Sequence, residues 1–234
     1  MSLAIFDLDD TLTMQDTESL WQGFLVEKKL IPVHLLQEKK ESFRLAYEAG
    51  VLNFEELITF SLDPIAKLSL AEQLKLQDEF TATVLKHAII PQAVELVTSH
   101  YEQGHTVLII SAGHEFLIHP AASFFPVHQV LCTTLDRLPN GAFAPTLIGK
   151  PLYREQKVYS LRTWLAQQKK SFTTTYFYSD SINDLPMLEY ADIPVVVNPC
   201  ERLKNVAHTK NWPILELKEQ YRRALQFQTG SATN

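Results

Sequence analysis

The sequence predicts an α/β fold in which a doubly wound parallel sheet carries an inserted helical domain. Four short apolar segments, suited to buried strands, each end in polar or turn-forming residues. Segments of helical length alternate with these strands, as expected when parallel strands are joined by crossover helices. A long stretch between the first and second strands shows helical periodicity and contains no comparable strand.

The expected strands lie at residues 3–6, 106–110, 175–178 and 194–197, and the helices of the same domain at 92–103, 115–124, 154–169 and 185–191. A hairpin is expected within 130–147, because two strand-like runs flank the tight-turn dipeptide Asn140-Gly141. Ligands of open α/β sheets bind beyond the carboxyl ends of the strands. The polar residues that follow each strand are therefore the candidates for a functional site.

The helical stretch sets the predicted domain boundaries. We expect a core domain formed by residues 1–15 and 89–228, a helical cap domain at 16–88, and a flexible, small and polar tail at 229–234. Asn53 is expected to cap a helix that begins near Phe54. A helical insert at the ligand-binding edge of the sheet suits a lid over the site.

The composition is that of a folded, soluble chain, with 46% hydrophobic and 21% charged residues. The net charge of −6, with scattered basic residues, gives no basic stripe for nucleic acid or for an anionic membrane surface. No apolar segment approaches the roughly 20 residues of a membrane span. The two cysteines, Cys132 and Cys200, are interpreted as ordinary thiols. We therefore expect a cytoplasmic monomer or homodimer whose partner is a small molecule.

Two acidic clusters follow apolar strands. The first contains Asp7, Asp9 and Thr11, and the second contains Asp180 and Asp184. A solvated acidic turn is the alternative for the first cluster, and an Asp that caps the following helix is the alternative for the second. Carboxylates at such short separations repel one another unless a cation binds between them. Hard oxygen ligands on two strand ends suit one Mg²⁺ that also contacts a substrate phosphate.

Two further elements could hold an anion. Ser111 is followed by Ala112 and Gly113 at an expected strand-to-helix turn, where a hydroxyl and backbone N–H groups form an anion site. The alternative is a tight turn filled by small residues. Lys157 lies on an expected helix, and a solvated lysine is the alternative there.

In order and spacing these four clusters resemble the motifs of the haloacid dehalogenase superfamily. The matching residues are Asp7, Asp9 and Thr11 for D-x-D-x-T, Ser111, Lys157, and Asp180 with Asp184 for the final acidic motif. The resemblance implies a Rossmann-like core and a phosphatase. The cap position is that of the phosphoserine phosphatase subfamily, and residues 178–188 resemble its histidinol-phosphatase-like bacterial branch.

The resemblance also implies roles for single residues. Asp7 is the expected nucleophile, which forms an aspartyl-phosphate, and Asp9 is the expected general acid and base. Ser111 and Lys157 are expected to complete the catalytic set by neutralising phosphoryl charge. The residues implied to contact phosphate are Thr11, Ala112, Gly113 and Asn183.

The implied metal is Mg²⁺. Its expected ligands are Asp7, Asp180 and the backbone carbonyl of Asp9, and Asp184 is expected to orient this set without touching the ion.

Substrate choice is expected to come from the cap. Asp16 matches the acidic position that meets the substrate amine in phosphoserine phosphatases, and Phe54 matches a pocket phenylalanine. Where that subfamily has an arginine for the substrate carboxylate, this chain has Ser61. An amine-bearing phosphate without a carboxylate, such as histidinol phosphate, therefore fits better than phosphoserine. The alternatives are that Asp16 only caps a helix and that Phe54 belongs to the core.

Three other functions remain open. Phosphoserine phosphatase is one alternative, and a sugar phosphomutase, which shares both catalytic acids, is another. A catalytically silent phosphometabolite-binding protein is the third, although such a protein would be expected to have lost an essential acid or Lys157.

Overall fold

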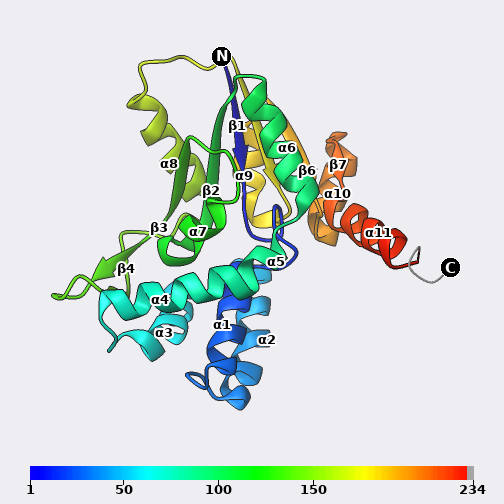
Figure 1. Ribbon diagram of the computed structural model, residues 1–234. Coiled ribbons are helices and arrows are strands. Elements are labelled where there is room, and N and C mark those ends of the chain that lie inside the picture. Colours follow the sequence, from blue (N-terminus) through cyan, green and yellow to red (C-terminus); the bar gives the residue numbers. More distant parts are fainter. Residues whose placement is uncertain (231–234) are drawn as a thin grey trace.

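The computed structural model describes residues 1–230, which are arranged around one seven-stranded sheet (Figure 1). The strand order is β4-β3-β2-β1-β5-β6-β7. Neighbouring strands are parallel except for the antiparallel pair β3 and β4. The strands are β1 (Ser2–Phe6), β2 (Thr106–His114), β3 (Gln129–Arg137), β4 (Phe143–Ile148), β5 (Thr174–Ser179), β6 (Ile193–Val197) and β7 (Ile214–Leu215). The predicted α/β fold is confirmed.

Both faces of the sheet are buried. On β1, Ala4 and Phe6 belong to one hydrophobic cluster, whereas Leu3 and Ile5 belong to the other. Successive side chains of a strand point to opposite faces, and a strand that is covered on both faces is apolar throughout. This explains why the strands read as continuous apolar runs.

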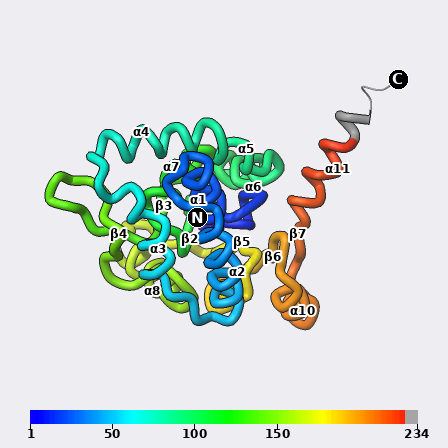
Figure 2. Tube along the Cα trace, turned by 90° about the horizontal axis from the view of Figure 1, so that it is seen from below, coloured from blue at the N-terminus to red at the C-terminus, as the bar shows by residue number. Residues whose placement is uncertain are grey.

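Helices cover these two faces. The face that contains Phe6 packs against α6 (Pro91–Glu102), α7 (Glu115–Ala122) and the first part of α11 (Leu217–Gly230). The opposite face, which contains Ile5, packs against α8 (Glu155–Ala166), α9 (Leu185–Tyr190) and α10 (Glu201–Lys210). Figure 2 shows α11 extending away from the rest of the chain.

The segment between β1 and β2 is helical. It contains α1 (Thr17–Glu27), α2 (Val33–Ala49), α3 (Phe54–Leu62), α4 (Leu70–Phe80), the π-helical turn η2 (Thr81–Leu85) and α5 (Lys86–Ala88). In Figure 1 helices α1 to α4 gather below the sheet, at the end toward which β1 points. Asn53 caps α3 by accepting a hydrogen bond from the backbone N of Glu56 at 3.2 Å, as predicted.

Two boundaries differ from the prediction. Strand β2 continues to His114, because His114 pairs with Thr133 of β3 after a register shift. The segment from Ser111 to Gly113 therefore lies in the last part of a strand, and the predicted strand-to-helix turn at these residues is wrong. Helix α11 continues to Gly230, so the predicted tail at 229–234 begins inside a helix, while residues 231–234 lie outside the described part of the chain.

The predicted hairpin is confirmed by the antiparallel pair β3 and β4. The side chain of Asn140 accepts a hydrogen bond from the backbone N of Ala142 at 3.1 Å, and Gly141 has a φ of 81°, which favours glycine. Cys132 and Cys200 are free thiols. Among residues 1–230, no helix combines the length and apolar character needed to cross a bilayer.

Candidate active site

The candidate active site lies where the carboxyl ends of three adjacent strands meet. Strand β1 is paired with β2 on one side and β5 on the other. Because parallel strands end at the same edge of the sheet, this order brings Asp7, Ser111 and Asp180 together although they are far apart in the sequence. The helices of the 16–88 segment lie below this edge in Figure 1.

Asp7 is fixed directly after β1. Its backbone N donates to the carbonyl of Tyr178 at 2.9 Å, and its side chain is only 6% exposed. Lys157 Nζ lies 2.7 Å from Asp7 Oδ1. Burial, and then the neighbouring Asp184, raise the pKa of Asp7 to about 6, although Lys157 acts in the opposite direction. Lys157 therefore holds the carboxylate in one orientation and favours its ionised form.

Lys157 is 2% exposed and bridges two carboxylates, because its Nζ also lies 2.7 Å from Asp184 Oδ2. Burial alone would lower the pKa of Lys157, but Asp184 and Asp7 together raise it above the ordinary value. The alternative of a solvated lysine is therefore wrong. Asp184 Oδ2 accepts a further hydrogen bond from Ser179 Oγ at 2.7 Å and makes no helix-cap bond, so the capping interpretation of Asp184 is also wrong.

Asp7 and Asp180 converge on the hydroxyl of Thr11. Thr11 Oγ1 lies 3.2 Å from Asp7 Oδ2 and 3.1 Å from Asp180 Oδ1, and it accepts a hydrogen bond from the backbone N of Asp180 at 3.0 Å. One hydroxyl proton cannot satisfy both carboxylates at once. Burial, and then Asp7, raise the pKa of Asp180 well above its usual range. The carboxylate oxygens are hard metal ligands, and too little positive charge lies beside them. The arrangement therefore fits a divalent cation such as Mg²⁺.

The side chain of Asp9 is turned toward a different set of partners. Its Oδ1 accepts a hydrogen bond from the backbone N of Thr17 at 2.7 Å, and its Oδ2 accepts one from Ser111 Oγ at 3.2 Å. Over residues 1–230, no cluster of three or more His, Cys, Asp or Glu side chains is placed to hold a metal. Asp7 and Asp180 are the two carboxylates that share the Thr11 hydroxyl, and Asp9 instead faces Thr17 and Ser111.

Burial, followed by the charges of Asp7 and Asp16, raises the pKa of Asp9 to about 7. A carboxyl with this pKa gives up and takes back a proton near neutral pH. Gly113 lies beside it, since a Cβ at this position would be 3.3 Å from Asp9 Oδ2 and 2.5 Å from Ile118 Cδ1. A side chain at Gly113 would therefore displace Ile118 and crowd the Asp9 carboxyl.

Asn183 joins the site to α2. Its Nδ2 donates to the carbonyl of Tyr47 at 2.9 Å, and Tyr47 OH donates to Ser181 Oγ at 3.2 Å. Tyr153 OH donates to the same Tyr47 carbonyl at 3.2 Å. The contacts of Tyr47 with Asn183, Ser181 and Tyr153 were not predicted, because Tyr47 lies 106 to 136 positions from them and no spacing relates residues so far apart. The position of Tyr47 at the end of a helical pattern was the only signal available.

The cap residues expected to bind substrate have structural partners. Asp16 caps α1, with Oδ1 accepting from the backbone N of Ser19 at 2.7 Å, whereas Oδ2 accepts no hydrogen bond from residues 1–230. Burial, and then Asp10, raise the pKa of Asp16 to about 6. Phe54 is 9% exposed and contacts the ring of Tyr153, with centroids 5.1 Å apart. Asp16 therefore caps α1 through one oxygen, and its other oxygen remains available.

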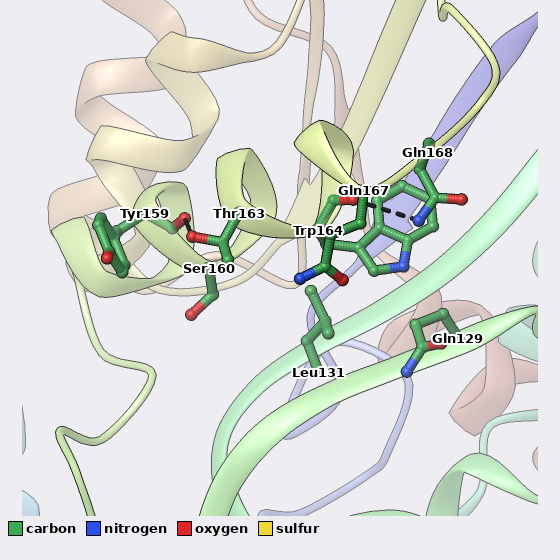
Figure 3. Close-up of a pocket in the computed structure, with 8 residues that line it drawn as sticks. All are labelled: Gln129, Leu131, Tyr159, Ser160, Thr163, Trp164, Gln167 and Gln168. Atoms are coloured by element: carbon green, nitrogen blue, oxygen red, sulfur yellow. Dashed lines mark hydrogen bonds between the residues drawn. The ribbon is translucent and has the colours of Figure 1, made fainter.

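A second surface feature lies elsewhere. A shallow groove of about 490 Å³ runs between α8 and the start of β3 (Figure 3). None of its lining residues belongs to the acidic clusters, and all of them carry neutral side chains: Gln129, Leu131, Tyr159, Ser160, Thr163, Trp164, Gln167 and Gln168. The groove therefore lacks the charges that the strand-end site concentrates.

Comparison with known proteins agrees with this geometry. The model of the haloacid dehalogenase-like hydrolase family matches residues 4–189, a span that includes every motif described above. The chain belongs to this family. This hydrolase is 36% identical, over 220 residues, to a histidinol-phosphatase of Neisseria meningitidis serogroup C (strain 8013). The alignment covers 93% of this chain and 99% of that protein. The hydrolase is an enzyme of the phosphatase class.

Solved structures extend the comparison to the fold. This hydrolase superposes on a protein of unknown function from Bordetella pertussis Tohama I with a TM-score of 0.83 and 30% identity, covering 92% of this chain and 98% of that one. It also superposes on a substrate-bound phosphoserine phosphatase with a TM-score of 0.68, covering 96% and 97% of the two chains. At 16% identity the second likeness shows a shared fold alone.

Proposed function

We propose that this phosphatase is a Mg²⁺-dependent phosphomonoesterase that works through an aspartyl-phosphate on Asp7. One observation carries the proposal: two carboxyls that are two residues apart, Asp7 and Asp9, have partners of different charge. Asp7 is held by the ammonium group of Lys157, whereas Asp9 accepts hydrogen bonds from two neutral groups, the backbone N of Thr17 and the hydroxyl of Ser111, and has a pKa raised to about 7. Such a pair supplies one nucleophile and one proton donor.

In the first step an oxygen of Asp7 attacks phosphorus, and the bond between phosphorus and the alcohol oxygen of the substrate breaks. Asp9 donates its proton to the departing oxygen, so that an alcohol leaves. In the second step Asp9 takes a proton from water, which attacks phosphorus, releases inorganic phosphate and regenerates the Asp7 carboxylate. Lys157 and Ser111 stabilise the charge on the phosphoryl oxygens, and both lie within hydrogen-bond distance of a catalytic carboxyl.

Further phosphate contacts are proposed for the residues around this pair. Thr11 lies in the segment after β1, where its hydroxyl contacts Asp7, and Asn183 lies in the turn after β5, while the backbone amides of Ala112 and Gly113 lie near the end of β2. Asp7, Asp180 and the carbonyl of Asp9 would hold Mg²⁺, with Asp184 orienting Lys157 behind them. When bound, the ion supplies positive charge to the phosphoryl group.

The proposed substrate is a small, amine-bearing phosphomonoester such as histidinol phosphate. The similarity to a histidinol-phosphatase supports it, as does Oδ2 of Asp16, which accepts no hydrogen bond from the part of the chain that the structure describes. Ser61, at the position of the expected arginine, is fully buried and hydrogen-bonded to Gln22 at 3.0 Å, so it offers no cation to a substrate carboxylate. Phosphoserine is therefore the weaker candidate. We also propose that the enzyme acts in the cytoplasm.

A phosphate-release assay tests the proposal. Histidinol phosphate, phosphoserine and glucose 6-phosphate are each incubated with the enzyme and Mg²⁺, with an excess of chelator as the metal-free control. We expect histidinol phosphate to give the highest kcat/KM and chelator to abolish release. Asp7→Asn, which is nearly isosteric, should fold normally and lose turnover. Transfer of phosphate between two positions of a sugar, without release, would instead identify a phosphomutase.

A further inference from the structure

A buried polar cluster lies next to Asp9 and has no part in the proposed mechanism. Its members are Glu18, Gln22, Ser61 and His114. His114 is 1% exposed, Gln22 is 3% exposed and Ser61 is fully buried, and the Glu18 side chain is 16% exposed. Buried polar groups are costly unless they are paired, so a cluster of this kind requires an explanation.

The centre of the cluster is a contact between a carboxylate of α1 and an imidazole of β2. Glu18 Oε2 lies 3.2 Å from His114 Nε2. Neither ring nitrogen of His114 makes a hydrogen bond of good geometry with residues 1–230, so Glu18 is the main polar neighbour of this imidazole. The imidazole is thus held between a carboxylate and the hydrophobic core.

The other oxygen of Glu18, Oε1, is held by hydrogen bonds from two side chains. Gln22 Nε2 donates to Glu18 Oε1 at 3.2 Å, and Ser61 Oγ of α3 donates to the same oxygen. Gln22 Nε2 also lies 3.0 Å from Ser61 Oγ, and Trp21 Nε1 donates to the Ser61 carbonyl at 3.0 Å. The Glu18 carboxylate therefore has one orientation, with Oε2 directed at His114.

The two segments joined by this contact are the same two that hold Asp9. Thr17, whose backbone N donates to Asp9 Oδ1, directly precedes Glu18. Ser111, whose hydroxyl donates to Asp9 Oδ2, lies three residues before His114 on β2. The Glu18–His114 contact therefore joins the same two segments that carry the two donors of Asp9.

From this arrangement we infer that Glu18 and His114 are positioning residues for Asp9. They tie the start of α1 to the end of β2, and so keep both donors at hydrogen-bond distance from the proton-transferring carboxyl. This inference rests on the role of general acid proposed for Asp9. It does not depend on the identity of the natural substrate.

The test uses two substrates of similar shape that differ in their need for an acid. Phenyl phosphate releases a poor leaving group that requires protonation, whereas 4-nitrophenyl phosphate releases a stabilised phenolate that does not. The parameter measured is kcat/KM, because it includes only the steps up to departure of the leaving group, before Asp9 acts as a base. Glu18→Gln changes the acidic partner of the contact, and His114→Asn changes the imidazole partner.

We expect each variant to lower kcat/KM for phenyl phosphate about tenfold, a part of the hundredfold or more that a general acid contributes. The value for 4-nitrophenyl phosphate should change less than about twofold. Glu27→Gln, at the exposed end of α1, and His119→Gln, an exposed histidine of α7, are the matched controls and should leave both values unchanged.

Asp9→Asn separates the two ways in which the inference can fail. If Asp9→Asn affects both substrates equally, the acid role of Asp9 is wrong and the inference fails with it. The other outcome is that Asp9→Asn lowers kcat/KM for phenyl phosphate alone, while Glu18→Gln and His114→Asn lower kcat/KM for both substrates equally or for neither. That result would overturn only the positioning role. The melting temperature of each variant shows how much folded protein enters the assay.

Discussion

Lys157 Nζ is equidistant from two buried carboxylates, 2.7 Å from Asp7 Oδ1 and 2.7 Å from Asp184 Oδ2. The ammonium group therefore orients the predicted nucleophile and neutralises a second acid that lies behind it. Removing one partner of a buried ion pair leaves an uncompensated charge, which commonly costs about 3 to 5 kcal/mol.

The first prediction follows from this pair. Lys157→Met should lower the free energy of unfolding by about 3 kcal/mol and abolish turnover, because Asp7 and Asp184 then repel each other without a cation. Adding Asp184→Asn to that variant should recover much of the stability and none of the activity. Chemical denaturation and phosphate release measure the two effects separately. Lys150→Met, at an exposed position nearby, is the control and should be silent in both.

Much of the fold could be predicted from the sequence because parallel strands buried on both faces are continuously apolar. The four strands predicted from such runs, including those around Ile5 and Phe177, are present, and the polar residues at their ends meet at one edge of the sheet. Asp184 was predicted from the acidic cluster after a strand and Lys157 from the family resemblance, but their direct contact was not predicted. A helix and a strand end that are 27 residues apart carry no spacing that fixes a 2.7 Å distance.

The contacts of the cap could not be predicted for a related reason. Tyr47 reaches Asn183 and Ser181 across more than 130 positions of sequence. The extension of β2 was missed because Ser111 to Gly113 are small residues that favour turns. Pairing of His114 with Thr133 outweighs that local preference.

The second prediction concerns the pH dependence of stability without metal. Burial raises the pKa of Asp9 to about 7 from an ordinary value of 3.8. Between these two values the folded state binds more protons than the unfolded state, so this carboxyl makes the protein more stable as the pH falls, by at most about 1.4 kcal/mol per pH unit. Asp9→Asn should therefore raise the melting temperature in chelator at about pH 8, keep less than half of that advantage in free energy at about pH 5, and lose it only below the unfolded pKa of 3.8.

Two outcomes of that experiment are informative. An equal effect of Asp9→Asn at both pH values would mean that the pKa of Asp9 is not raised in the folded state. Mg²⁺ should reduce the pH dependence of the parent protein, because it favours the ionised forms of Asp7 and Asp180. The same scans in Mg²⁺ check this point.

The third prediction concerns backbone strain beside the site. Arg154 precedes α8 with φ 55° and ψ −123°, a conformation that favours glycine and costs other residues about 1 to 3 kcal/mol. Its guanidinium lies against Gly50, and its ion pair with Glu155 spans 3.9 Å with half-exposed side chains, which adds little stability. Arg154→Gly should therefore raise the free energy of unfolding by about 1 kcal/mol, as measured by denaturation.

Arg154→Ala is the matched comparison, because it removes the same side chain and keeps the strain. The alanine variant should be no more stable than the parent protein, and the difference between the two variants measures the strain itself. Equal stability of Arg154→Gly and Arg154→Ala would show that the backbone at this position is not strained.

The last prediction separates recognition from architecture at Asp16. Its Oδ1 caps α1 through the backbone N of Ser19, and its Oδ2 is the oxygen proposed to bind a substrate ammonium group. Asn is an almost equally good helix cap, so Asp16→Asn should leave the melting temperature nearly unchanged. It removes one charge-assisted hydrogen bond, which is worth roughly 1.5 to 3 kcal/mol.

That loss corresponds to about a ten- to hundredfold decrease in kcat/KM, and it should be confined to substrates that carry an amine. Histidinol phosphate should be hydrolysed more slowly by Asp16→Asn, whereas 4-nitrophenyl phosphate, which has no ammonium group, should be hydrolysed as before. A decrease shared by both substrates would place the effect in the catalytic step, through the charge that Asp16 exerts on Asp9. No decrease with either substrate would leave Asp16 as a helix cap alone, and substrate selection would then have to come from other residues of the cap.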